Sequence, residues 1–186
     1  MTARPAFHNV YTLAAFEHAE QALCSPGIAL LDRLWTQAHQ AREESTLDAG
    51  ALTSLTPERR AAAVLYPHTA ARWAWFTDAA VAHAWGRYRH RGQHSGDVVS
   101  GTGVLITRLN GAVQWQPLDA VGHAFLCLFA DGGTFAQAAA AVRAADLTQD
   151  HPRGSPVSQV AATLLAAGAF NRISITRIHR QFFRRA

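Results

Sequence analysis

The dipeptide Asn110-Gly111 constrains the fold of this chain more than any other feature. It lies between two segments rich in apolar residues, Val104–Leu109 and Ala112–Leu118. Both central residues of a type I′ turn need a positive φ, which Asn and Gly adopt at little cost. An Asn-Gly pair between such segments is the strongest short-range signal for a β-hairpin. The sequence therefore predicts that these two segments pair as antiparallel strands.

Two helices are predicted directly after the hairpin. Asp119 is a good N-cap for the first, whose apolar residues have helical spacing and which ends at Asp131-Gly132-Gly133. Thr134 and Gln137 have the spacing of a capping box. A second, alanine-rich helix is therefore expected from this box to about Ala145.

A third helix and a last strand complete this region. The dipeptide Ser155-Pro156 is typical of a helix start, which predicts a helix over Pro156–Ala167. Residues Phe170–Ile175 alternate between apolar and polar side chains, as a strand does. A hairpin packed on three helices is the plan of a winged-helix domain.

The first ninety residues are predicted to be all-helical. Stretches of apolar residues at helical spacing indicate four helices: Phe7–Leu23, Ile28–Arg42, a short helix from Thr56, and His68–Trp85. A basic, glycine-rich link follows from Gly86 to Gly103. The expected fold is α+β and mainly helical, with a helical N-terminal domain over residues 1–95. A winged-helix-like domain with an Arg-rich tail is expected over residues 96–186.

Composition sets the broad class of the protein. Every basic residue is arginine, which we interpret first as a genomic GC bias, and the net charge is +4 with a pI of about 9.8. This charge is compatible with an anionic partner but does not require one. Cys24 and Cys127 lie far apart in apolar helical segments, which favours buried, inert thiols. The sequence has no membrane-length apolar stretch and no secretion signal, so a cytoplasmic location is expected.

The sequence offers no recognisable reaction centre. Ten histidines are present, but they form no known ligand pattern, and Gly92 disfavours a helix that would bring His90 and His94 together. No nucleophile motif, phosphate loop or carboxylate pair is found. We therefore expect this chain to have no catalytic residues, no metal site and no cofactor of its own.

The hairpin predicts a site for an extended peptide. An edge strand of a small sheet can accept a peptide as an additional strand, with main-chain hydrogen bonds for affinity and side-chain pockets for specificity. The alternative is that the N-terminal helices or the tail cover this edge. The predicted peptide-binding residues lie on the first hairpin strand and the third helix: Val104, Leu105, Ile106, Thr107, Arg108, Val157, Val160 and Leu164.

Docking of a partner protein is predicted at aromatic and basic residues. The tail alternates arginine with apolar residues, and tryptophan is enriched at protein interfaces. For the tail, contact with nucleic acid and a frayed terminus are the alternatives, and for the tryptophans the alternative is a place in the core. The predicted partner-docking residues are Trp73, Trp85, Arg177, Arg180, Phe182 and Phe183.

Residues 65–175 resemble the C-terminal region of a known family, the partner proteins of multinuclear non-heme iron-dependent oxidases. Members of that family have a strand–turn–strand unit, a helix that starts at a D-G-G-T-F motif, and a last helix that ends in L-x-x-x-G-A-F. The matching segments here are Val104–Arg108, Val113–Asp119, Asp131–Ala138, Leu164–Phe170 and the upstream Pro67–Trp73 with Val81 and Trp85. The same pattern is similar to the precursor-recognition elements of ribosomal peptide natural-product pathways, which are winged-helix-like.

The resemblance implies a non-catalytic subunit. Such a subunit would bind the leader of a small precursor peptide and dock on an iron-dependent oxidase that modifies a cysteine in that peptide. The iron would belong to the oxidase. Relatives include partner subunits of the methanobactin and 3-thiaglutamate pathways.

A winged-helix DNA-binding protein is the alternative function. The fold and the basic pI would suit it, but the expected recognition helix Pro156–Ala167 contains no arginine. Proteins that read base edges normally bring arginine, asparagine or glutamine into the groove, and phosphate contacts need positive charge nearby. The sequence therefore favours a peptide over nucleic acid as the partner.

Overall fold

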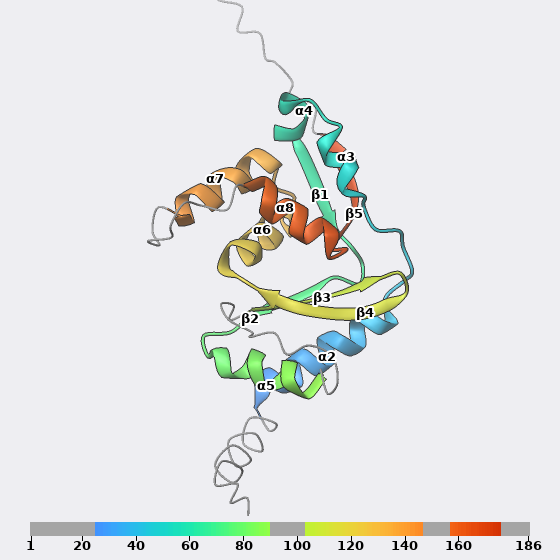
Figure 1. The fold of residues 1–186 in the computed structure, drawn as a ribbon, viewed down its shortest axis with the longest axis vertical. Helices are drawn as coiled ribbons and strands as arrows, with labels where there is room; N and C mark the ends of the chain where they lie inside the picture. The colour runs from blue at the N-terminus through green and yellow to red at the C-terminus, as the bar shows by residue number, and fades with distance from the viewer. Residues whose placement is uncertain (1–24, 90–102, 147–156, 176–186) are drawn as a thin grey trace, which may run out of the picture.

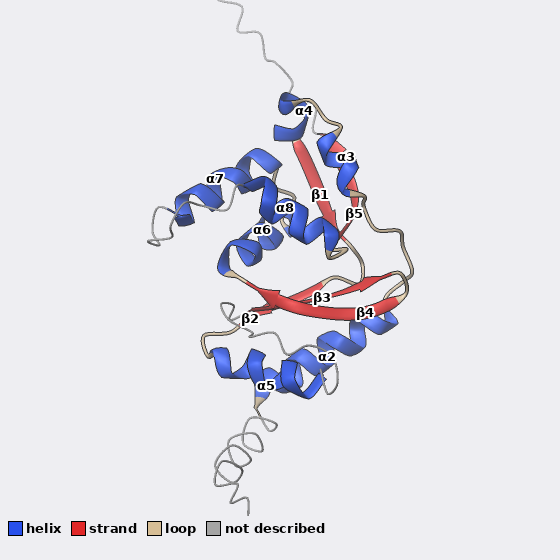
Figure 2. Ribbon diagram, in the orientation of Figure 1, coloured by secondary structure: helices blue, strands red, loops and turns tan. Residues whose placement is uncertain are grey.

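The computed structural model describes residues 25–89, 103–146 and 157–175. These residues form an α+β fold of helices and two small antiparallel sheets (Figure 2). The expected helix Phe7–Leu23, the link around His90 and His94, and the tail with Arg177, Arg180, Phe182 and Phe183 lie outside the described residues.

The larger sheet has the strand order β2 (Arg72–Trp75), β3 (Gly103–Leu109) and β4 (Ala112–Leu118). β3 and β4 form the predicted hairpin, with Leu109 opposite Ala112. The turn residues Asn110 and Gly111 have φ values of 52° and 79°, as a type I′ turn requires. The hairpin prediction is thus confirmed in its strands and in its turn.

This sheet lies between two layers of helices (Figure 1). On one face, Val104 and Ile106 of β3 pack with α2 (Pro26–Gln40) and α5 (Ala79–Arg89) in the α2–α5 core. On the other face, Leu105 packs with residues of α6 (Ala120–Ala130), α7 (Phe135–Asp146) and α8 (Val157–Ala166) in the α6–α8 core. β3 is therefore buried on both sides.

A second sheet pairs distant parts of the chain. β1 (Ala63–Pro67) is antiparallel to β5 (Phe170–Ile175), with Leu65 opposite Ile173. The short helices α3 (Ala49–Thr53) and α4 (Pro57–Ala61) precede β1. The buried residues Ala63, Leu65 and Phe170 belong to the α6–α8 core, so this sheet packs on the same three helices.

Local capping chemistry fixes the helix ends after the hairpin. The Asp119 carboxylate accepts a hydrogen bond from Gly122 N at 2.7 Å, which caps α6. In the capping box, Thr134 N donates to the Gln137 side chain at 2.8 Å, and Gln137 N lies 3.4 Å from Thr134 Oγ1. The predictions of these two helices are confirmed.

The prediction of an all-helical N-terminal region is wrong at two places. Residues 63–67 and 72–75 are strands, and the expected helix His68–Trp85 is a turn, then β2, then α5. Asp78 precedes α5 and caps it, because its carboxylate accepts a hydrogen bond from Ala80 N at 2.8 Å. Trp73 and Trp75 lie in β2, because aromatic side chains suit a half-buried pleated surface, whereas Trp85 is helical in α5.

Strand pairing links the two sides of the expected domain boundary. β2 pairs with β3, and β1 pairs with β5, so residues from the first ninety complete both sheets. The three helices and the hairpin of the expected winged-helix-like domain are all present in the described residues. The division into domains 1–95 and 96–186 and the winged-helix arrangement itself stay predictions.

Candidate functional site

β4 is an edge strand of the larger sheet, because β3 pairs with it on one side and no other described strand pairs on its other side. In a hairpin with a two-residue turn, the pair next to the turn is hydrogen-bonded and the pairs then alternate. Ala112, Gln114 and Gln116 therefore direct their backbone groups toward β3. The backbone groups of Val113 and Pro117 point toward the open side.

The position of Pro117 agrees with this geometry. Proline has no N–H and is confined in sheets to edge strands, with its nitrogen on the unpaired side.

The two faces of β4 also differ in chemistry. Val113 and Trp115 pack partly against the α2–α5 core, whereas Gln114 and Gln116 lie on the face of β3 residues Thr107 and Leu105. β4 has no charged residue, so its edge offers main-chain, amide and apolar contacts.

The structure places the predicted peptide-binding residues of β3 in the interior. Val104, Leu105 and Ile106 are 0% exposed and Thr107 is 2% exposed. Both edges of β3 are already paired, with β2 and with β4. No additional strand can join β3 in this arrangement, so the hypothesis that β3 is the receiving strand is corrected in favour of β4.

The remaining predicted peptide-binding residues lie near the end of β3 and on α8. Arg108 is partly buried, and its Nη1 donates to the His39 carbonyl at 3.3 Å. On α8, Leu164 is buried in the α6–α8 core and Val160 packs partly against it. Val157 begins α8, but its side chain is outside the described part of the structure. Among the side chains that the structure describes, Arg108, Val160 and Leu164 therefore do not form one exposed surface.

The predicted partner-docking tryptophans also lie against the cores. Trp85 is 0% exposed and belongs to the α2–α5 core, while Trp73 packs partly buried on the α6–α8 core. The Trp85 ring makes edge-on contacts with Trp35 and Trp115, with ring centroids 5.7 and 5.6 Å apart. Trp85 can therefore support a surface but cannot itself contact a partner.

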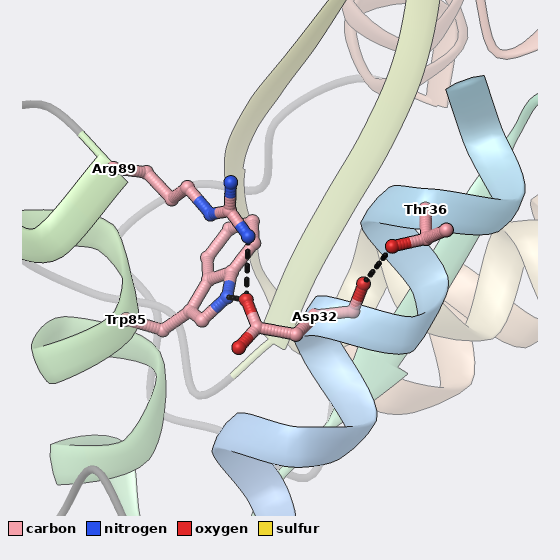
Figure 3. A network of polar contacts seen from close by, with 4 residues as sticks. All are labelled: Asp32, Thr36, Trp85 and Arg89. Carbon is pink, nitrogen blue, oxygen red and sulfur yellow. Dashed lines mark hydrogen bonds and ion pairs between the residues drawn. The ribbon is translucent and has the colours of Figure 1, made fainter.

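A polar network joins α2 to α5 beside the rings of Trp35 and Trp85 (Figure 3). Asp32 Oδ1 accepts a hydrogen bond from Trp85 Nε1 at 2.9 Å and one from Arg89 Nη2 at 2.6 Å. The Arg89 guanidinium carbon lies 4.9 Å from the centre of the Trp35 ring and 5.9 Å from that of Tyr88. Sequence patterns gave no sign of this network, because Trp85 and Arg89 lie 53 and 57 residues from Asp32 along the chain.

His123 and Cys127 form a second polar group, on α6. The Cys127 sulfur lies 3.7 Å from His123 Nε2, and the Trp75 ring packs at 5.4 Å from the His123 ring. Cys127 is a free, partly exposed thiol, which differs from the buried thiol expected. Burial lowers the pKa of His123 below its ordinary value, because it disfavours the charged imidazolium.

This pKa shift predicts a pH dependence of stability. A group whose pKa is lower in the folded state is protonated more readily in the unfolded chain. The His123 contribution is therefore fully present above about pH 6.5 and is lost as the pH falls through the lowered pKa. We expect the free energy of unfolding, measured by urea titration, to fall more between pH 7.5 and pH 5 in the wild type than in His123→Gln. Equal pH profiles of the two proteins would contradict this.

Among the described residues, no group of three His, Cys, Asp or Glu side chains could hold a metal ion. Within the same residues, no helix has both the length and the apolarity needed to cross a membrane. The edge of β4 is the candidate site. Comparisons of this chain with protein-family models, curated proteins and solved structures found no match.

Proposed function

We propose that this protein is a non-catalytic subunit that binds an extended precursor peptide on the open edge of β4 and presents it to an iron-dependent oxidase. The observation that carries the proposal is the position of β4 at the edge of a sheet whose central strand is buried. A seven-residue edge strand supports main-chain pairing with a peptide better than the four-residue β2 at the opposite edge.

The chemistry of the edge agrees with a peptide ligand. Pairing to β4 would place alternate peptide side chains near Val113 on one face and near Gln114 and Gln116 on the other. A peptide with apolar residues at every second position would bury them on the first face. Uncharged polar residues between them would meet the glutamines.

The oxidase partner is proposed from the sequence resemblance of residues 65–175. Such a subunit supplies binding and orientation, and the oxidase supplies the iron and the reaction at a cysteine of the peptide. The three helices after the hairpin, which that resemblance implies, support the same assignment.

The exposed face of α8 argues against the DNA-binding alternative. The side chains described as exposed there are Gln159, Ala162, Thr163 and Ala166, and α8 contains no charged residue. Phosphate contacts supply a large share of the affinity of DNA-binding proteins, mainly through Lys and Arg. A helix without positive charge is a poor reader of a DNA groove.

The substitution Val113→Pro tests peptide binding at the edge. It removes one outward N–H but leaves the β3–β4 hydrogen bonds in place, because Val113 occupies a non-hydrogen-bonded pair with Arg108. We expect peptide affinity, measured by fluorescence anisotropy with the precursor peptide encoded next to the gene, to fall about tenfold or more.

Val113→Ala is the matched control, since it shortens the same side chain and keeps the N–H. We expect its peptide affinity to stay within about threefold of the wild type, because few contacts are lost. Equal affinities of the Val113→Pro and wild-type proteins, with both folded by circular dichroism, would exclude the β4 edge as the peptide site.

A further inference from the structure

We infer that the surface around Arg89 on α2 and α5 docks an acidic segment of the oxidase subunit. We call this surface the Arg89 face and define it by Asp32, Trp35, Tyr88 and Arg89. The inference rests on the proposed function, because it names where the proposed partner binds. It differs from the partner-docking residues expected from the sequence, of which Trp85 is buried and Trp73 belongs to the opposite layer.

The Arg89 guanidinium is held in place before any partner arrives. Asp32 binds one terminal nitrogen, Nη2, at 2.6 Å, and Trp85 Nε1 fixes the same carboxylate oxygen at 2.9 Å. The rings of Trp35 and Tyr88 lie within 6 Å of the guanidinium carbon. Figure 3 shows the other terminal nitrogen, Nη1, pointing away from Asp32. A guanidinium fixed in this way can bind a second carboxylate with little loss of side-chain entropy.

The Arg89 face is accessible. Tyr88 is 57% exposed, and the side chains of Asp32 and Arg89 are 47% and 27% exposed. Tyr88 and Trp75 are the large apolar side chains exposed in the described part of the chain. Tyrosine, tryptophan and arginine are the residues that most often dominate binding energy at protein interfaces. The composition of the face is therefore typical of an interface centre.

The charge of the two helices determines the kind of partner. Arg33 and Arg87 are exposed, and with Arg89 they give α2 and α5 three positive charges against the single negative charge of Asp32. The nearest other acid along these elements is Asp78, which caps the opposite end of α5. The complementary partner surface is one that carries Asp or Glu side chains beside an apolar residue that packs on Tyr88.

The Arg89 face also lies close to the edge of β4, the proposed peptide site. The Trp85 ring contacts the Trp35 ring on one side and the Trp115 ring on the other. Trp115 lies on β4. Gly86 of α5 lies against Trp115, since a Cβ built there would be 2.4 Å from the indole ring. An oxidase bound at the Arg89 face would thus be next to a peptide bound at β4, as delivery of the peptide requires.

Two substitutions in the full-length chain test this inference. Tyr88→Ala removes an exposed ring, and Arg89→Lys keeps the positive charge beside Asp32 but removes the planar fork. Arg143→Ala, an exposed arginine on α7, is the matched control. For each variant we would measure the dissociation constant for the oxidase encoded next to the gene, at low and high salt, and in parallel the affinity for the precursor peptide.

We expect Tyr88→Ala and Arg89→Lys to bind the oxidase about tenfold more weakly or worse, with peptide affinity within about twofold of the wild type. We expect the Arg143→Ala control to match the wild type, and high salt to weaken wild-type binding. Wild-type oxidase affinity in both variants would overturn the inference and leave the proposed function intact. Failure of the wild type to bind the oxidase would overturn both.

Discussion

Substitution of Trp85 by alanine is expected to lower the free energy of unfolding by about 3–5 kcal/mol. The indole is fully buried between α2, α5 and β4, where it contacts Trp35 and Trp115. Removal leaves a large cavity and also removes the N–H that fixes Asp32. Urea unfolding followed by circular dichroism measures the effect.

The control for this experiment is Trp85→Phe, which keeps most of the aromatic volume and loses the hydrogen bond to Asp32. We expect it to cost about 1–2 kcal/mol, because the Asp32 carboxylate oxygen keeps its bond to Arg89. A Trp85→Ala protein of wild-type stability that fails to bind the oxidase would show instead that Trp85 is a docking residue, as the sequence indicated.

Substitution of Leu105 by alanine is expected to lower stability by about 2–5 kcal/mol. Leu105 is at the centre of the sheet, with Trp73 on one neighbouring strand and Gln116 on the other. Its side chain is 0% exposed in the α6–α8 core. The peptide affinity of the folded fraction should be unchanged, since Leu105 cannot reach a peptide at the β4 edge.

Val113→Ala provides the comparison for Leu105→Ala within the same hairpin. Val113 is only partly buried, so its truncation should cost about 1 kcal/mol or less. The two variants should therefore differ clearly in their urea midpoints. A stable Leu105→Ala protein with lost peptide binding would contradict the assignment of β3 to the core.

Local signals predicted the part of the fold that local chemistry determines. The Asn110-Gly111 turn, the Asp119 cap and the Thr134–Gln137 capping box each act within a few residues, and all three are present. The strand Phe170–Ile175 was also predicted with its observed bounds.

Long-range pairing decided the part that the sequence did not show. β2 is only four residues long and becomes a strand because β3 can pair with it. β1 likewise pairs with β5, more than one hundred residues away. The tryptophan spacing that fits a helix over residues 68–85 also fits a short strand followed by a helix, so periodicity alone could not separate the two.

The same limitation affected the candidate site. The sequence identified a hairpin edge but placed the peptide on β3, because a hairpin alone has two open edges. β2 closes the edge on the β3 side, and no strand of residues 25–89, 103–146 and 157–175 pairs with the outer edge of β4. The signals that could have identified β4 are Pro117, which belongs on an edge, and the polar Gln114 and Gln116 between apolar residues.

The measurement that tests the central claim most directly is co-expression of the tagged chain with the oxidase and the precursor peptide encoded next to its gene, followed by pull-down and metal analysis. The proposed function predicts a complex of all three, with iron present only when the oxidase is present. Recovery of the chain without oxidase or peptide, or with bound nucleic acid in their place, would contradict it.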